Sequence, residues 1–212
     1  MKSIYLCGFM GCGKSHIGRR LSKKLNMPLV DLDEYIVQKE KRSIPEIFEQ
    51  SGEPYFRQLE ADCLKELSDG YIVATGGGTL INENTAKYAN MHGVTVFLDA
   101  IFPVCYGRIK NDTNRPLVVN NTKEQLEAIF NTRRKIYKAH SAVTVRAAGT
   151  GSAITADVIR KVKYFTKGIK KPRPNRKSVN YGKHSSGAQM AQKAEKDNIK
   201  EDSRKGNKFE RT

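Results

Sequence analysis

The 212-residue sequence has no tryptophan, few other aromatic residues and only 4 cysteines. No apolar run approaches the ~20 residues that a membrane-spanning helix needs, so we expect no membrane span. The sequence lacks C-x-x-C and Cys/His metal spacings, which disfavours zinc sites and disulfides and favours free thiols at Cys7, Cys12, Cys63 and Cys105. Because the first expected strand begins at residue 3, we also expect no signal peptide, and hence a cytoplasmic protein.

Acidic residues are also few, and the resulting net charge of +16 is unevenly distributed. Residues 167–212 hold 14 Lys or Arg and 5 Asp or Glu, a net charge of +9. This segment is rich in Lys, Arg, Asn, Ser and Gln, and its few apolar residues follow no period, so it cannot bury enough surface to offset its ordering entropy. We therefore expect a folded domain over residues 1–167 and a basic, disordered tail over residues 168–212.

Within the first 165 residues, short apolar strands alternate with amphipathic helices, which predicts an α/β domain with a mostly parallel sheet covered by helices. We expect strands at residues 3–7, 28–31, 71–75, 94–98 and 142–145. We expect helices at residues 14–25, 35–41, 44–51, 53–67, 82–92, 101–109, 122–139 and 153–167. Capping boxes, Ser43 with Glu46 and Thr122 with Gln125, support two of the helix starts.

The strongest motif is G-F-M-G-C-G-K-S at residues 8–15, which fits the phosphate-binding loop pattern G-x-x-x-x-G-K-[ST]. It lies between an expected strand and an expected helix, so the positive end of the helix dipole faces a bound phosphate. Lys14 can reach the outer phosphates, and the Ser15 hydroxyl can ligate Mg²⁺. Cys12 lies inside the loop; its thiol would be oxidation-sensitive if exposed, but we interpret it as a small filler residue.

A D-x-D pair, Asp31 and Asp33, ends the second expected strand. Ligands of open parallel sheets bind at the carboxyl edge, and the alternation places both carboxylates there on the same side. One carboxylate can organise a metal shell, and the other can accept a proton from a substrate hydroxyl. Alternatively, one of them caps the following helix.

Two further patterns point to a small anionic acceptor. Arg57 and Glu60 are three residues apart in F-R-Q-L-E, so they can pair on one helix face and present a guanidinium to a carboxylate, although a solvated ion pair fits the spacing equally well. Three consecutive glycines at 76–78 follow an apolar strand, where backbone N–H groups can approach a ligand or form a flexible turn.

The polar stretch of residues 111–117 predicts a lid whose Arg115 stabilises the charge of a transferred phosphoryl group and whose closure excludes water. On the next helix, Arg133 lies four residues before Tyr137 and offers a second guanidinium. Spacing alone does not separate Arg133 from its neighbours Arg134 and Lys135.

Taken in order, the motifs are G-x-x-G-x-G-K-S, D-x-D, F-R-x-x-E, G-G-G, N-R-P-L and R-x-x-x-Y. This set resembles the shikimate kinase family over about residues 1–165. The resemblance implies a P-loop NTPase fold of nucleoside monophosphate kinase type, with a five-stranded parallel sheet in the order 2-3-1-4-5. It also implies transfer of the ATP γ-phosphate to the 3-hydroxyl of shikimate, on the route to chorismate and the aromatic amino acids.

For ATP, the resemblance implies that the phosphates are bound by Gly11, Cys12, Gly13, Lys14, Ser15 and His16. Lys14 would act on the transferred charge, and Mg²⁺ would be held by Ser15 and, through water, by Asp31. Arg115 would be the lid arginine on the phosphates, and Arg108 would stack near adenine. Residues 146–148 stand where the family has its late adenine-contacting loop, but they cannot be matched individually.

For shikimate, the resemblance implies that Asp33 holds the ring hydroxyls and orients or deprotonates the attacking one. Arg57 and Arg133 would bracket the carboxylate, and Gly77 and Gly78 would offer backbone donors. We expect a monomer whose domain binds neither nucleic acid nor membrane.

Two other functions fit parts of the sequence. A related small-molecule kinase, such as a gluconate kinase, shares the phosphate loop and the lid arginine, but the paired arginines and the triple glycine argue against it. A nucleotide-sensing protein that binds nucleic acid through its tail is suggested by the +9 charge. The tail holds only Tyr181 and Phe209 for base stacking, so we favour a solubilising extension.

Overall fold

The computed structural model describes residues 2–112 and 115–168. The predicted tail, except its first residue, therefore lies outside the described residues. None of the described helices is both long enough and apolar enough to cross a membrane.

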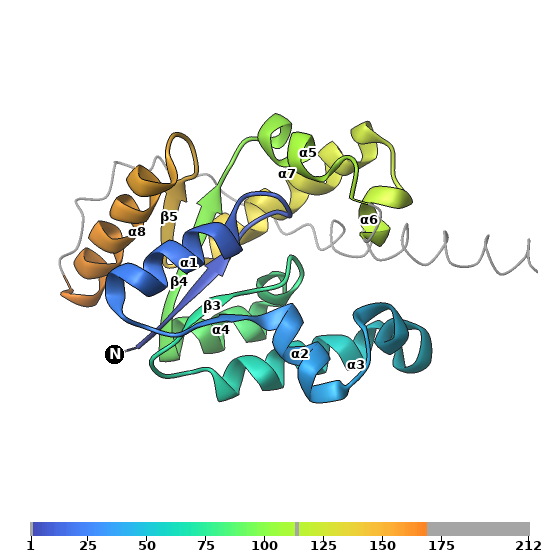
Figure 1. Ribbon diagram of the computed structural model, residues 1–212, viewed down its shortest axis with the longest axis horizontal. Helices are drawn as coiled ribbons and strands as arrows, with labels where there is room; N and C mark the ends of the chain where they lie inside the picture. Colours follow the sequence, from blue (N-terminus) through green and yellow to red (C-terminus); the bar gives the residue numbers. More distant parts are fainter. Residues whose placement is uncertain (1, 113–114, 169–212) are drawn as a thin grey trace, which may run out of the picture. The chain divides into compact units, whose positions relative to one another are not determined.

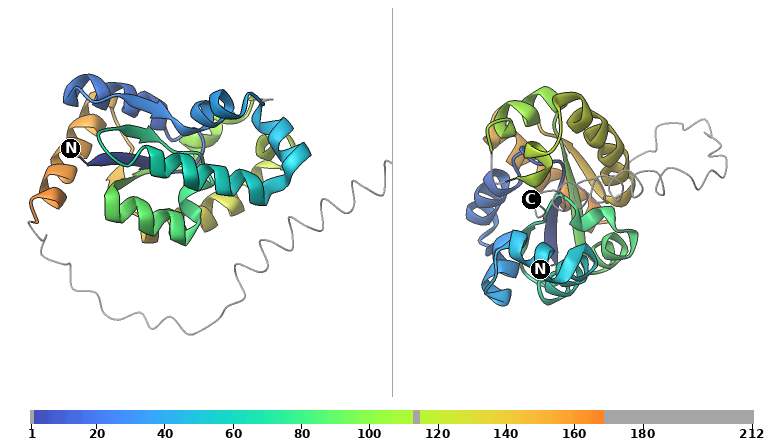
Figure 2. Two further views of the ribbon diagram at one scale, coloured as in Figure 1. Left: turned by 90° about the horizontal axis from the view of Figure 1, so that it is seen from below. Right: turned by 90° about the vertical axis from the view of Figure 1, so that its right-hand side faces the viewer.

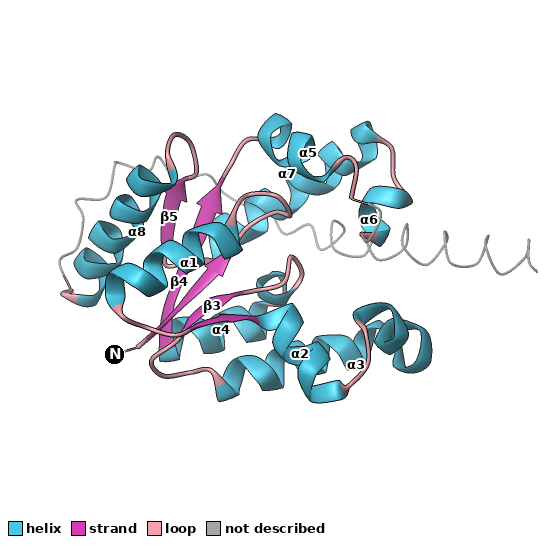
Figure 3. Ribbon diagram, in the orientation of Figure 1, coloured by secondary structure: helices cyan, strands magenta, loops and turns pink. Residues whose placement is uncertain are grey.

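Five strands form one parallel sheet in the order β2-β3-β1-β4-β5, as predicted (Figures 1 and 3). Their bounds are β1 Ser3–Cys7, β2 Leu29–Asp31, β3 Ile72–Ala74, β4 Gly93–Asp99 and β5 Val143–Arg146. The central strand β1 is entirely buried, which explains why its sequence is continuously apolar except for Ser3. The strand arrows in Figure 3 run in one direction, so their carboxyl ends share one edge of the sheet.

Helices cover both faces of this sheet. Their bounds are α1 Lys14–Leu25, α2 Leu32–Glu40, α3 Ile44–Glu66, α4 Glu83–His92, α5 Phe102–Ile109, α6 Pro116–Val119, α7 Lys123–His140 and α8 Gly151–Thr166, with a short 3₁₀ turn η1 at Thr79–Ile81. α1 and α8 pack side by side on one face, and α4 and α7 contact β4 on the other (Figure 2, right). α2 with α3 and α5 with α7 extend beyond the carboxyl edge of the sheet (Figure 1).

Beyond shifts of one or two residues at element ends, the structure departs from the predicted elements at four places. α2 begins at Leu32, three residues before the predicted start, because Asp31 caps it. The two helices predicted at 44–51 and 53–67 join into α3 across a kink at Gly52, whose φ of 78° is not helical. The structure adds α6, which overlaps the end of the predicted lid stretch, and η1 after the glycines. Both capping boxes are confirmed, with Ser43 and Thr122 as the capping residues.

Candidate active site

The predicted phosphate loop connects the carboxyl end of β1 to the first turn of α1. Its backbone requires glycine at three points: Gly8 has φ 140°, Gly11 has φ 75° and Gly13 has φ 103°, values that residues with a Cβ rarely adopt. A Cβ on Gly11 would also lie 2.7 Å from the Cys105 carbonyl oxygen. The Lys14 ammonium bends back and donates to the carbonyl oxygens of Gly8 (2.9 Å) and Phe9 (3.3 Å). The loop therefore carries a cation at its mouth and the first N–H groups of α1 at its base.

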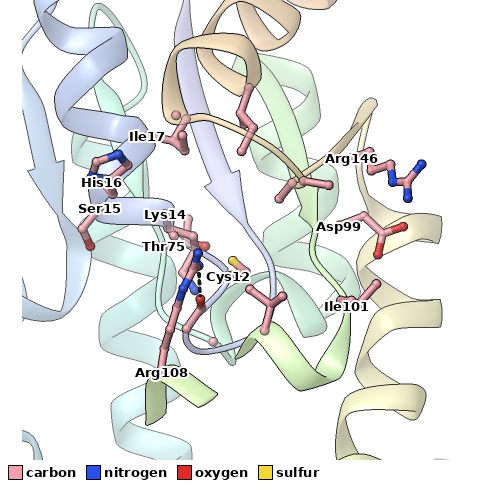
Figure 4. A pocket seen from close by; sticks show the side chains of 18 of the residues that line it. Cys12, Lys14, Ser15, His16, Ile17, Thr75, Asp99, Ile101, Arg108 and Arg146 are labelled. Carbon is pink, nitrogen blue, oxygen red and sulfur yellow. Dashed lines mark hydrogen bonds between the residues drawn. The ribbon is translucent and has the colours of Figure 1, made fainter. Parts of the chain in front are cut away.

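A cavity of about 790 Å³ opens at this edge of the sheet (Figure 4). Most of the predicted site residues line it: Gly11, Cys12, Gly13, Lys14, Ser15, His16, Asp31, Asp33, Gly77, Arg108 and Arg115. Three predicted substrate residues are absent from its lining: Gly78, which ends the glycine turn at 76–78, and Arg57 and Arg133, which lie next to that turn. The structure thus brings the two groups of predicted residues together around residues 76–78.

The D-x-D pair does not continue the strand as the alternation suggested. Asp31 ends β2 and caps α2 by accepting from the Asp33 N–H (3.2 Å), while Asp33 lies in the first turn of α2. The helix turn, rather than strand alternation, aims Asp33 into the cavity. Asp31 also accepts a hydrogen bond from the Ser15 hydroxyl (2.9 Å), so it both caps the helix and faces the phosphate loop.

The donors around Ser15 and Asp31 suit Mg²⁺. One hydroxyl and one carboxylate oxygen lie 2.9 Å apart at the mouth of the loop. Mg²⁺ prefers oxygen ligands and is commonly held by one or two protein groups together with substrate phosphates and waters. Among the described residues no cluster of three or more His, Cys, Asp or Glu forms a metal site.

Asp33 has the perturbed acidity expected of a catalytic base. Burial, followed by the nearby charges of Glu60 and Asp31, raises the pKa of its carboxyl to about 6, against the opposing charges of Lys14 and Arg115. The close approach depends on Gly76, because a Cβ there would lie 2.7 Å from Asp33 Oδ1 and 2.8 Å from Glu60 Oε1. A carboxylate poised near neutrality in a cleft is a candidate proton acceptor.

Behind the glycine turn, Arg57 is held by two carboxylates of its own helix. It donates to Glu60 Oε2 at 2.6 Å and to Glu53 Oε1 at 2.8 and 3.0 Å. Glu60 is only 2% exposed and also accepts from the Thr79 hydroxyl at 2.5 Å. Gly78 provides the space for this fork, because a Cβ there would lie 2.2 Å from an Arg57 guanidinium nitrogen. The guanidinium is therefore held between one buried carboxylate, Glu60, and one exposed carboxylate, Glu53.

The structure separates the three neighbouring cations of α7. Arg133 faces the glycine turn, with a guanidinium nitrogen 3.9 Å from the position that a Gly77 Cβ would take. Arg134 instead pairs with Asp99, and Lys135 is exposed. Tyr137, one turn after Arg133, is buried and donates its hydroxyl to the Gly77 carbonyl oxygen at 2.5 Å. Burial raises the pKa of Tyr137, so this hydroxyl keeps its proton and remains a donor.

Two more predicted arginines line the cavity from the other side. Arg108 donates to the Gly11 carbonyl oxygen at 2.8 Å, the bond drawn in Figure 4. Arg115 pairs with Asp112 at 2.7 Å and lies close enough to Asp33 to affect its pKa. Both guanidiniums therefore face the phosphate loop or the candidate base.

Sequence reasoning missed part of the nucleotide side. Asp99 and Arg146 end β4 and β5, and with the turn at 147–149 they form the wall opposite α1 (Figure 4). The resemblance had located residues 146–148 as a loop without matching them individually, and the rule that ligands bind at the carboxyl edge could also have found Asp99. Ile101, which caps α5, and Ile154 of α8 also line the cavity, but isolated apolar residues carry no sequence signal that separates them from core residues.

All four cysteines are free, as predicted, and the structure buries all four. A Cβ on Gly8 would lie 2.9 Å from the Cys12 sulfur, so this sulfur packs against the backbone at the start of the phosphate loop. The interpretation of Cys12 as a small filler residue agrees with this packing. Burial raises the pKa of the Cys7 and Cys105 thiols to about 12, so neither is a thiolate at neutral pH.

The family model described as shikimate kinase matches residues 10–163. A shikimate kinase from Sulfurihydrogenibium sp. (strain YO3AOP1) is 39% identical over 165 residues, which cover 77% of this chain and 99% of that protein. The crystal structure of the shikimate kinase from Aquifex aeolicus VF5 has a TM-score of 0.69 at 37% identity and covers 78% of this chain and 99% of its own. The shikimate kinase from Acinetobacter baumannii, solved in complex with shikimate, has a TM-score of 0.69 at 30% identity over 81% of this chain and 96% of its own.

Proposed function

Because this chain belongs to the shikimate kinase family, we propose that it transfers the γ-phosphate of ATP to the 3-hydroxyl of shikimate. The alternative of a gluconate-type kinase is not favoured, because the matching family model and the relatives at 30–39% identity are shikimate kinases.

One structural observation carries the proposal. The Asp33 carboxylate lines the same cavity as Lys14 and Arg115, and it lies across Gly76 from the Glu60 carboxylate that holds Arg57. The phosphate loop and the arginine proposed to bind a carboxylate therefore both lie near Asp33, a candidate base whose pKa is raised. A small polyol acid that places its carboxylate on Arg57 and one hydroxyl on Asp33 fits this arrangement.

On the nucleotide side, phosphoryl transfer needs positioning and charge neutralisation more than covalent chemistry. In our proposal, Lys14 leaves the carbonyl oxygens that it contacts here and moves to the β- and γ-phosphates. Arg115 exchanges Asp112 for the transferred group, and Arg108 lies along the adenine. Ser15 and, through water, Asp31 hold Mg²⁺, which when bound offsets the charge of the β- and γ-phosphate oxygens.

On the acceptor side, Asp33 accepts a hydrogen bond from the attacking hydroxyl and takes its proton as that oxygen bonds to the γ-phosphorus. The bond from this phosphorus to the β,γ-bridging oxygen breaks in the same step, and ADP leaves with the electron pair. Arg57 and Arg133 bracket the shikimate carboxylate, and the N–H groups of Gly77 and Gly78 face the acceptor. This division gives Lys14, Arg115, Asp33, Arg57 and Arg133 each a partner on one of the two substrates.

The direct test measures ADP release from the purified full-length protein with ATP, Mg²⁺ and shikimate, with gluconate as the competing acceptor. We expect turnover on shikimate and none above background on gluconate. Turnover on gluconate without turnover on shikimate would refute the proposal. Omission of Mg²⁺, with EDTA present, should abolish the signal.

The basic tail is proposed to be dispensable for this reaction. A protein ending at residue 168 should keep the kcat and both KM values of the full chain within about twofold, whereas a large loss of kcat would mean that the tail contributes to the site. Retention of the full-length protein, but not the truncated one, on RNA at ~150 mM salt would favour the nucleic-acid hypothesis.

We also propose that the enzyme is monomeric and cytoplasmic. The buried, free cysteines are consistent with a reducing compartment. Light scattering on the eluting protein tests the oligomeric state.

A further inference from the structure

An ion pair at the edge of the cavity joins the nucleotide wall to the helix that carries Arg133. Asp99, the last residue of β4, accepts from Arg134 through both oxygens, at 2.6 Å from Nε and 2.8 Å from a terminal nitrogen. This fork-to-fork geometry fixes the guanidinium in a plane, unlike a single-point contact. Asp99 lines the cavity, whereas Arg134 is not among its lining residues.

Asp99 is itself firmly placed. It pairs with Arg146 in the parallel ladder between β4 and β5, and its carbonyl oxygen accepts from the Ala147 N–H at 3.0 Å. The carboxylate that Arg134 binds therefore belongs to the rigid wall of the nucleotide side.

α7 brings three side chains to the cleft within two turns. Arg133 and Tyr137 are four residues apart and both face Gly77, so they share one side of the helix. Arg134 follows Arg133 directly and lies about 100° further around the helix. An anchor at Arg134 and a hydrogen bond at Tyr137 together restrict rotation of α7 about its axis.

We propose that Arg134 is a positioning residue: its ion pair with Asp99 sets the rotation of α7 and so aims Arg133 at the acceptor carboxylate. Arg134 acts through its helix and does not touch either substrate. The inference rests on the proposed function, because it assigns Arg133 to the carboxylate of shikimate.

The pair is suited to orientation more than to stability. The Arg134 side chain is 48% exposed and that of Asp99 18%, and exposed ion pairs contribute little to the free energy of unfolding. Variants of Arg134 should therefore fold. Small misplacements of substrate-positioning groups, in contrast, can cost one to two orders of magnitude in activity.

The test compares Arg134→Gln with Lys135→Gln, which removes the same charge from the next, exposed residue of α7. For Arg134→Gln we expect the KM for shikimate to rise roughly tenfold while the KM for ATP changes less than about threefold. Lys135→Gln should match the wild type in both. Arg134→Lys, which keeps the charge but loses the fork, should give an intermediate KM for shikimate.

A double-mutant cycle ties the effect to the ion pair. Asp99→Asn should raise the KM for shikimate as Arg134→Gln does, and the double variant should be no worse than the single ones. Titration calorimetry of shikimate in the absence of nucleotide should show the same loss of affinity. Melting temperatures should differ from that of the wild type by only a few degrees.

The inference is overturned if Arg134→Gln and Lys135→Gln have the same KM for shikimate, if the KM for ATP rises as much as that for shikimate, or if the effects of Asp99→Asn and Arg134→Gln add fully. These outcomes all require a wild type that phosphorylates shikimate. A wild type without that activity would instead refute the proposed function, so the two failures are distinguishable.

Discussion

The two ends of the cleft are built in different ways. The nucleotide end centres on one contiguous segment, residues 11–16, where glycine backbone and a single ammonium face the ligand. The acceptor end is assembled from four separate segments: the first turn of α2, the middle of α3, the turn at 76–78 and the middle of α7.

The electrostatics differ as well. At the nucleotide end the Lys14 ammonium donates to the backbone carbonyl oxygens of Gly8 and Phe9. The acceptor end packs charges of both signs against each other, with Glu60 between Arg57 and Asp33. The nucleotide end thus depends on local backbone geometry, and the acceptor end depends on tertiary packing that sets both position and acidity.

The largest expected effect concerns the residue where the two ends meet. Asp33→Asn should lower kcat by ~10²–10⁴-fold, because it removes the candidate proton acceptor and keeps the size of the side chain. Glu34→Gln, which neutralises the adjacent exposed carboxylate of α2, is the matched control and should retain wild-type kcat. Steady-state kinetics at saturating shikimate and ATP would measure both. A loss below tenfold for Asp33→Asn would mean that the reaction needs no base at this position.

A somewhat smaller effect is expected from the arginine that faces both ends. Arg115→Ala should lower kcat by about 10²-fold, because a cation on the transferring group stabilises the transition state more than the bound substrates. Lys110→Ala removes an exposed cation directly before the predicted lid at residues 111–117, and it should leave kcat unchanged. Single-turnover measurements would separate chemistry from product release. If Arg115→Ala raised only the KM for ATP, Arg115 would be a binding residue rather than a catalytic one.

The acceptor end alone should respond to Arg57. Arg57→Ala should raise the KM for shikimate by about 10–100-fold, the cost of losing a hydrogen bond to a charged group, and leave the KM for ATP nearly unchanged. Lys65→Ala removes an exposed cation from the same helix, α3, and serves as the control. An unchanged KM for shikimate in Arg57→Ala would place the substrate carboxylate elsewhere and would break the division of the cleft into two ends.

The contrast between the ends also explains which parts the sequence could predict. The phosphate loop needs its glycines and Lys14 at fixed spacing, so its geometry can be predicted from eight consecutive residues. The bounds of β1 and α1 were predicted to the residue for the same reason.

The acceptor end could be predicted only as a set of separate motifs. No spacing rule joins Glu60 to Asp33, which are adjacent only because the α2–α3 pair folds over Gly76. Nor could spacing choose among the three cations at 133–135, since that choice depends on the rotation of α7 against β4. Strand alternation was the wrong argument for Asp33, because the cap at Asp31 starts a helix before a second strand position is reached.

The acidity of Asp33 predicts a pH dependence that an exposed aspartate would not produce. Its pKa is raised from 3.8 to about 6, so the deprotonated base is lost as the pH falls through about 6. We expect kcat/KM for shikimate to fall about tenfold between pH 7.5 and pH 5, with the inflection near 6. Glu34→Gln should keep this profile. A rate that stays flat down to pH 5 would show that Asp33 is not the titrating base.

The smallest effect is a gain in stability that should accompany the loss of activity. Burial and the charges of Glu60 and Asp31 raise the folded-state pKa of Asp33, so the folded protein binds this proton more tightly than the unfolded chain. The free energy of unfolding therefore falls as the pH rises from about 4 to about 6, and at pH 7.5 the charged carboxylate costs about 1–3 kcal/mol. Asp33→Asn removes that cost.

Urea denaturation should find the variant more stable than the wild type at pH 7.5 and equal to it at pH 4, whereas Glu34→Gln should show no such pH-dependent difference. Equal stability at both pH values would mean that the charged carboxylate is as well solvated in the fold as in the unfolded chain, and the packing of charges at the acceptor end would then carry no energetic cost.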